Sequence, residues 1–149
     1  MEEQRGGLTV TYQPEGSAGI AELRVQARVP PFAGAATGYF NDDDLRAFAA
    51  AISAYPLPAE AHSRLTAGLG DQETVGLEVA QVTSRGQLAV TIHLAVTDPG
   101  PYPYLTPTAA DARMVLLTSY QALHDFAAAL LAAIDGQGGT ARLPADELA

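Results

Sequence analysis

The pair of segments Thr74 to Val82 and Gln87 to Val96 places the tightest constraint on how this chain can fold. In both segments apolar and polar residues alternate, which is the period of a β-strand with one buried face. A turn at Ser84 and Arg85, or a longer loop with Gly86 at positive φ, joins them into an antiparallel hairpin. With the two-residue turn, apolar residues meet at every second pair: Val79 with Val90, Leu77 with Ile92, and Val75 with Leu94.

Three other segments are predicted to be strands. Ile20 to Val29 alternates clearly, and Pro30-Pro31 then ends it. Leu8 to Tyr12 alternates more weakly and forms a first strand, whereas Arg113 to Leu117 forms the last one. The residues that share the apolar face of the clearest strand are Leu23, Val25, Ala27 and Val29.

Apolar residues at helical spacing predict two helices. The first helix runs from about Asp42 to Tyr55. The second begins after Ser119, a favoured N-cap residue, and Gly136 fits its end. The apolar positions at helical spacing in the first helix are Leu45, Phe48, Ala49, Ile52 and Tyr55. The expected buried face of the second helix holds Leu123, Phe126, Ala127, Leu130 and Ile134.

The remaining segments lack a clear period. Residues 56–71 are predicted to form a loop or a short irregular helix, and residues 97–107, with four of the ten prolines, form a long connection. Residues 137–149 are predicted to be a mobile C-terminal tail. The expected fold is a single α+β domain over residues 1–136, with an antiparallel sheet of about five strands, two helices packed on one of its faces, and the order ββαβββα.

The composition and charge of the chain limit which partners and which cellular compartment are expected. The net charge is −9, and the eight basic residues are all arginines scattered along the chain, which disfavours nucleic acid as a partner. A basic protein partner suits the charge better. Cysteine is absent, so disulfides, thiolate nucleophiles and cysteine zinc sites are excluded. The N-terminus has no apolar core of the length that a signal peptide needs, and the longest helical apolar run, residues 126–134, is too short to cross a bilayer, which predicts a cytoplasmic protein without a membrane partner.

The run Asp42-Asp43-Asp44 is the one stretch that resembles a metal or acid–base site. Asn41 before it is a favoured N-cap, and three carboxylates in a first turn interact well with the positive end of the helix dipole. Phe40 and Leu45 are spaced as a hydrophobic staple. Successive helical side chains point about 100° apart, so three in a row do not converge on one ion. The run is therefore interpreted as a helix start.

Other motifs that carry chemistry are weak. The histidines His62, His93 and His124 show no metal-ligand spacing, and His93 is expected on the polar side of its strand. No serine lies in a nucleophile elbow. The sequence therefore predicts no catalytic residue, no cofactor and no metal, although an enzyme that uses carboxylates and a histidine is retained as an alternative.

Tyr102 and Tyr104 are the predicted partner-binding residues. They lie among prolines in the long connection, and tyrosine is enriched among the anchors of protein interfaces. The contact would be with a partner protein or between two copies of this chain in a homodimer. The alternative is that both tyrosines fold back and cover an open end of the core.

Three segments resemble bacterial WapI-type immunity proteins. They are "GYFNDDDLRAFAAAI" (residues 38–52), "VGLEVAQVTSRGQLAVTIHL" (residues 75–94) and "TSYQALHDFAAALLAAI" (residues 118–134). The resemblance implies a non-enzymatic immunity or antitoxin-like protein that neutralises a cognate bacterial toxin by occlusion, and the negative charge suits a basic toxin. The alternative function is a small-ligand or effector-binding domain with its pocket between helices and sheet.

Overall fold

A computed structural model describes residues 6–15, 19–53, 63–69, 72–82, 87–97 and 108–145. In these residues the chain forms eight strands and two helices, which makes it an α+β protein. The elements are β1 (Gly7–Glu15), β2 (Ile20–Val29), β3 (Phe32–Asn41), α1 (Asp42–Ile52), β4 (Ser63–Leu69), β5 (Gln72–Gln81), β6 (Gln87–Thr97), β7 (Thr108–Ser119), α2 (Tyr120–Asp135) and β8 (Gly139–Pro144).

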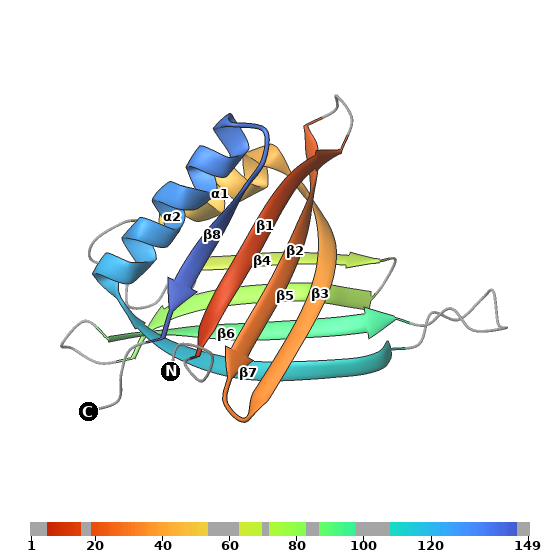
Figure 1. The fold of residues 1–149 in the computed structure, drawn as a ribbon, viewed down its shortest axis with the longest axis vertical. Helices are drawn as coiled ribbons and strands as arrows, with labels where there is room; N and C mark the ends of the chain where they lie inside the picture. The colour runs from red at the N-terminus through yellow and green to blue at the C-terminus, as the bar shows by residue number, and fades with distance from the viewer. Residues whose placement is uncertain are drawn as a thin grey trace, which may run out of the picture.

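The strands form two antiparallel sheets that pack face to face (Figure 1). The first sheet has the order β3-β2-β1-β8, and the second has the order β4-β5-β6-β7. The strands of one sheet run across those of the other, so that β3 contacts β4, β5 and β6, while β2 contacts β7. The inner faces of both sheets therefore contribute to one core.

The two helices lie side by side and close one side of this core. Helix α1 packs against β3 and β4, and α2 packs mainly along β8. The predicted buried face of α2 is buried in the structure, as are Leu45, Phe48, Ala49 and Ile52 of α1, whereas Tyr55 lies outside the described residues. Neither helix in the described ranges is long and apolar enough to cross a membrane.

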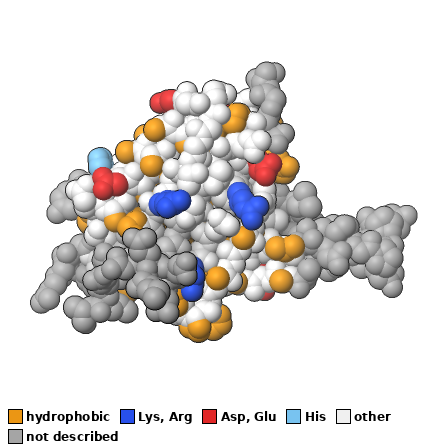
Figure 2. Space-filling model, viewed as in Figure 1, with side chains coloured by type: hydrophobic (Ala, Val, Ile, Leu, Met, Phe, Trp, Pro, Cys, Tyr) orange, Lys and Arg blue, Asp and Glu red, His pale blue; other side chains and the backbone are white. Residues whose placement is uncertain are grey.

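The outer face of the first sheet has no helix over it and is shown in Figure 2. Alternation along β2 turns Leu23 and Val25 inward to full burial, while Arg24 and Gln26 are exposed. In Figure 2 basic side chains, coloured blue, lie on this face above β1, β2 and β8.

The predicted hairpin is confirmed with its register. Strands β5 and β6 pair Val79 with Val90, Leu77 with Ile92 and Val75 with Leu94, and all six residues are buried. The bounds of β2 also match the prediction, and the chain reverses at Pro30-Pro31 into β3. Helices α1 and α2 begin at the predicted residues.

The expected single sheet of about five strands is corrected to two sheets of four. Three strands were not predicted, namely β3, β4 and β8. In β3 the inward positions are Ala36, Gly38 and Phe40, and alanine and glycine give almost no alternating signal. Gly38 is required here, because a Cβ at this position would lie 2.9 Å from the Cβ of Ala67 in β4.

The other two missed strands are short and carry few apolar residues. Strand β4 lies within the segment 56–71, which was expected to be a loop or an irregular helix, and its inward residue Leu65 is buried. Strand β8 lies within residues 137–149, which were expected to be a mobile tail. It pairs with β1, bringing Leu143 opposite Leu8 and Ala141 opposite Val10. Ala141 and Leu143 are both buried, so strand β8 belongs to the core.

The hairpin gives a direct test of which face of the second sheet is buried. Ile92 is fully buried, whereas its neighbour Thr91 is half-buried on the opposite face, across from Glu78. We expect Ile92→Asp to prevent folding, because an unpaired charge cannot be accommodated in the core. Thr91→Asp should fold and lose about 0.2–1 kcal/mol, owing to the like charge of Glu78. Circular dichroism during urea unfolding measures both, and equal damage from the two changes would contradict this assignment of faces.

Candidate functional site

The aspartate run begins α1 as predicted. Asn41 has extended dihedrals, and its side-chain oxygen accepts a hydrogen bond from the backbone N–H of Asp43 at 2.8 Å. Phe40 and Leu45, the two staple residues, are both buried. No group of three metal-binding side chains occurs within the described ranges. The hydrogen bond to Asn41 therefore confirms the predicted N-cap.

Asp42 also has a contact that the sequence did not predict. The hydroxyl of Tyr12 in β1 donates a hydrogen bond to Oδ1 of Asp42 at 2.8 Å. Burial, followed by this hydrogen bond and the negative charge of Asp42, raises the pKa of Tyr12 from 10.0 to about 12. The side chain of Tyr12 is almost completely buried. This contact fixes the start of α1 to the first sheet.

His93 lies at the centre of a charged cluster on the outer face of the second sheet. Its Nδ1 is 2.5 Å from a carboxylate oxygen of Glu73, and its Nε2 is 3.3 Å from one of Asp111. Glu73 also lies 3.6 Å from Arg64. Both ring nitrogens of His93 therefore face carboxylates from neighbouring strands. The prediction that His93 is on the polar face is confirmed.

A missing side chain makes this cluster possible. Gly76 is the Cα partner of His93, and a Cβ at Gly76 would lie 3.0–3.1 Å from the carboxylate of Glu73. The register between β4 and β5 shifts between Ala67 and Gly68, and the shift brings Glu73 onto the outer face beside Gly76. Regular period-two alternation would place Glu73 on the inner face with Val75, so the sequence pattern did not predict the contact between Glu73 and His93.

The other polar residues singled out in the sequence lie apart from this cluster. His124 is exposed on α2, and His62 lies outside the described residues. Ser119 is the N-cap of α2, where its side-chain oxygen accepts a hydrogen bond from the backbone N–H of Ala122 at 3.2 Å. The predicted contact residues Tyr102 and Tyr104 also lie outside the described residues, so their role stays a prediction.

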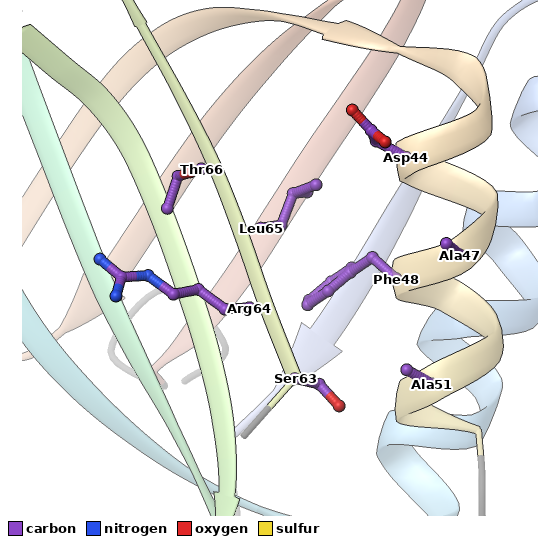
Figure 3. Close-up of a pocket in the computed structure, with 8 residues that line it drawn as sticks. All are labelled: Asp44, Ala47, Phe48, Ala51, Ser63, Arg64, Leu65 and Thr66. Atoms are coloured by element: carbon purple, nitrogen blue, oxygen red, sulfur yellow. The ribbon is translucent and has the colours of Figure 1, made fainter. Parts of the chain in front are cut away.

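A groove between α1 and β4 is the candidate binding site. It has a volume of about 350 Å³, and it is lined by Asp44, Ala47, Phe48 and Ala51 of α1 and by Ser63, Arg64, Leu65 and Thr66 of β4. In Figure 3 the ring of Phe48 and the side chain of Leu65 project into the space between the helix and the strand. Both residues are buried, so they form an apolar floor. Ala47 and Ala51 are exposed on the helix side.

Strand β4 forms the other side of the groove and provides both the backbone groups of a sheet edge and the charged residue Arg64. Strand β4 is at the edge of its sheet and pairs with β5 alone among the described strands. Alternate N–H and C=O groups of an edge strand have no partner within their own sheet. Arg64 and Thr66 point to the opposite side of β4 from α1 (Figure 3), and Arg64 reaches Glu73 there. The groove therefore adjoins the His93 cluster through one strand.

The hydrogen bond from Tyr12 separates the roles of the first two aspartates. Asp42→Ala should cost about 1–3 kcal/mol in the free energy of unfolding, because it leaves the buried hydroxyl of Tyr12 without this acceptor. Asp43→Ala should cost about 0.3–1 kcal/mol, because it removes an interaction with the helix dipole. Urea unfolding measures both. A melting temperature that rises with Mg²⁺, Ca²⁺ or Mn²⁺ in the parent but not in these variants would contradict the capping interpretation.

The raised pKa of Tyr12 predicts a loss of stability at alkaline pH. The contribution of Tyr12 is complete below pH 10 and is lost as the pH rises through about 12, because the unfolded chain ionises first. Over this window the difference in the free energy of unfolding between the parent and Tyr12→Phe should change by about 1.4 kcal/mol per pH unit. Unfolding at several pH values measures this difference. A difference that stays constant from pH 9 to 12 would disprove it.

Searches against protein-family models, curated proteins and solved structures find no match to this chain.

Proposed function

We propose that this protein is a non-enzymatic binding protein that takes an extended segment of a partner protein into the groove between α1 and β4. The observation that carries the proposal is the edge of β4, which has no strand partner in the described part of the chain and borders an apolar floor. Adding a strand to a sheet edge beside a groove is a recurring mode of peptide recognition.

The groove offers the two kinds of interaction that this mode needs. Backbone groups along the free edge of β4 would pair with the incoming strand, and each hydrogen bond contributes about 0.5–1.5 kcal/mol net. One apolar side chain of the segment would fit between Phe48 and Leu65. Burying a valine- or leucine-sized side chain contributes about 1.5–3 kcal/mol. Backbone hydrogen bonds to β4 would provide affinity, and the apolar pocket would select which side chain of the bound segment fits.

The partner that we propose is a bacterial toxin, bound and occluded in the manner of an immunity protein. The support is the resemblance of residues 38–52, 75–94 and 118–134 to WapI-type immunity proteins. A net charge of −9 would speed association with a basic toxin. In this proposal Tyr102 and Tyr104 provide a second contact with the toxin.

The same groove also favours the alternative of a small-ligand-binding domain. Its volume of about 350 Å³ lies within the range of about 300–1,000 Å³ that is usual for ligand pockets. A small molecule that raises the melting temperature of the parent, combined with failure to select any peptide, would support this alternative over strand addition.

Filling the groove tests the proposal. Ala51 lines the groove and is exposed, whereas Ala50 is exposed on the same helix but does not line it. A random peptide library displayed on phage is selected on the immobilised parent protein. We expect the selected peptides to bind Ala51→Trp at least about tenfold more weakly than the parent, a loss of about 1.4 kcal/mol. Binding to the matched control Ala50→Trp should stay within about twofold of the parent.

Two outcomes would contradict the proposal. One is that no peptide is enriched, and the other is that the selected peptides bind Ala51→Trp as well as Ala50→Trp. Methylation of alternate backbone nitrogens in a selected peptide should abolish binding in one register and spare it in the other, because only alternate amides face the neighbouring strand. For the toxin, co-expression with a toxin encoded by a neighbouring gene should restore growth with Ala50→Trp and fail with Ala51→Trp.

A further inference from the structure

Three arginines stand together on the outer face of the first sheet. Arg24 and Arg28 lie in β2, and Arg142 lies in β8, and all three are exposed. Their neighbours along each strand point into the core, so the three guanidinium groups belong to the opposite face. Figure 2 shows this face, with basic side chains spread across it. We call Arg24, Arg28 and Arg142 the arginine face.

Strand register fixes how the arginine face is spaced. Thr9 of β1 is the Cα partner of both Gln26 and Arg142, so Arg142 lies two strands away from β2 and level with Gln26. Arg24 and Arg28 are each two residues from Gln26 along β2. With about 4.8 Å between strands and about 3.3 Å per residue, each pair of arginine Cα atoms is separated by roughly 12–13 Å. The three residues form a near-equilateral triangle.

The side chains within this triangle and on the neighbouring parts of β1, β3 and β8 are uncharged, and Glu22 lies next to Arg24 along β2. Thr9, Thr11 and Thr140 lie on the same face of β1 and β8, and the hydroxyls of Thr11 and Thr140 are 3.5 Å apart. On β3 the exposed side chains facing Arg24 and Arg28 are those of Thr37 and Ala33. The three guanidinium groups therefore extend beyond the shorter side chains around them, so a partner can contact them.

Charge distinguishes this face from the rest of the chain. The outer-face positions of the described strands of the first sheet hold three arginines and two acidic residues, Glu15 at the end of β1 and Glu22 in β2. None of the three arginines forms an ion pair or hydrogen bond with a described residue, whereas Arg46 pairs with Asp135 at 2.7 Å and Arg64 lies 3.6 Å from Glu73. In a chain of net charge −9, these three exposed arginines without a partner among the described residues form a local positive patch.

We propose that the arginine face binds a carboxylate-rich segment of a partner protein. Guanidinium groups match carboxylates in bidentate geometry, and such charge-assisted pairs are among the stronger hydrogen bonds. A separation of roughly 12–13 Å corresponds to four residues of an extended strand or eight residues of a helix, so one acidic segment can meet two corners. This inference is independent of the groove between α1 and β4, which lies at a different edge of the molecule.

A phosphate backbone is the less suitable occupant. Nucleic acid binding draws on a positive field over many phosphates, and the net charge of −9 opposes that field around the remainder of the molecule. A short acidic segment interacts mainly with charges within a Debye length of about 8–10 Å. At that distance the nearby arginines contribute most of the electrostatic field. Binding of an acidic peptide and of a nucleic acid can be compared directly to distinguish these two occupants.

The probe is a fluorescein-labelled oligo-L-glutamate long enough to span about 25 Å, compared with an oligothymidylate of similar length. The arginine face is removed in the triple variant Arg24→Gln/Arg28→Gln/Arg142→Gln. The matched control is Arg113→Gln, which removes an exposed arginine from the outer face of the second sheet. Fluorescence anisotropy at about 0.05 and 0.15 M NaCl measures binding. Melting curves establish that both variants are folded.

We expect the triple variant to bind oligoglutamate at least about tenfold more weakly than the parent, and the control to change by less than about twofold. An NMR titration of the parent should shift amide signals of β1, β2 and β8. Equal losses in the two variants, absence of binding to the parent, or tighter binding of oligothymidylate than of oligoglutamate would each overturn the proposal.

Discussion

The close approach of the two sheets at β3 determines where the other elements can lie. Along the inner face of β3 the side chains are small, and a methyl group at Gly38 would collide with Ala67 and with the ring of Phe40. At Gly34 an added Cβ would meet Leu94 and Met114 of the second sheet at ordinary contact distance. Because β3 lies so close to β4, β5 and β6, the sheets converge there, while α1 packs beside this contact on β3 and β4 and α2 packs along β8.

This constraint explains which parts of the fold the sequence could predict. The hairpin β5–β6 was predicted with its register because large apolar residues meet across it, and a shift by one residue would expose all of them. Strand β3 was missed because its role requires small side chains, which carry little alternating signal. Strand β8 was missed because only Ala141 and Leu143 face inward. Strands β3 and β8 are therefore defined by what they pack against rather than by their own pattern.

The candidate sites follow the same rule. The cap at Asn41 is local, so spacing alone revealed it. The hydrogen bond from Tyr12 to Asp42 joins residues that are thirty positions apart, and the contact between Glu73 and His93 needs a shift in register beside a glycine. The groove exists because a helix and an edge strand lie next to each other, and no single segment contains it. Sequence patterns identify elements, whereas sites depend on how these elements meet.

The pairing of β1 with β8 has a consequence for how the chain acquires its structure. Val10 pairs with Ala141, so the first sheet is complete only after residues 139–144 are available. Contacts so distant in sequence slow folding, because the entropy of closing the loop is lost before the contact forms. Until then the edge of β1 is open to other strands, including those of neighbouring copies. During synthesis the unpaired edge of β1 therefore stays exposed until residues 139–144 leave the ribosome. Aggregation competes with folding during that interval.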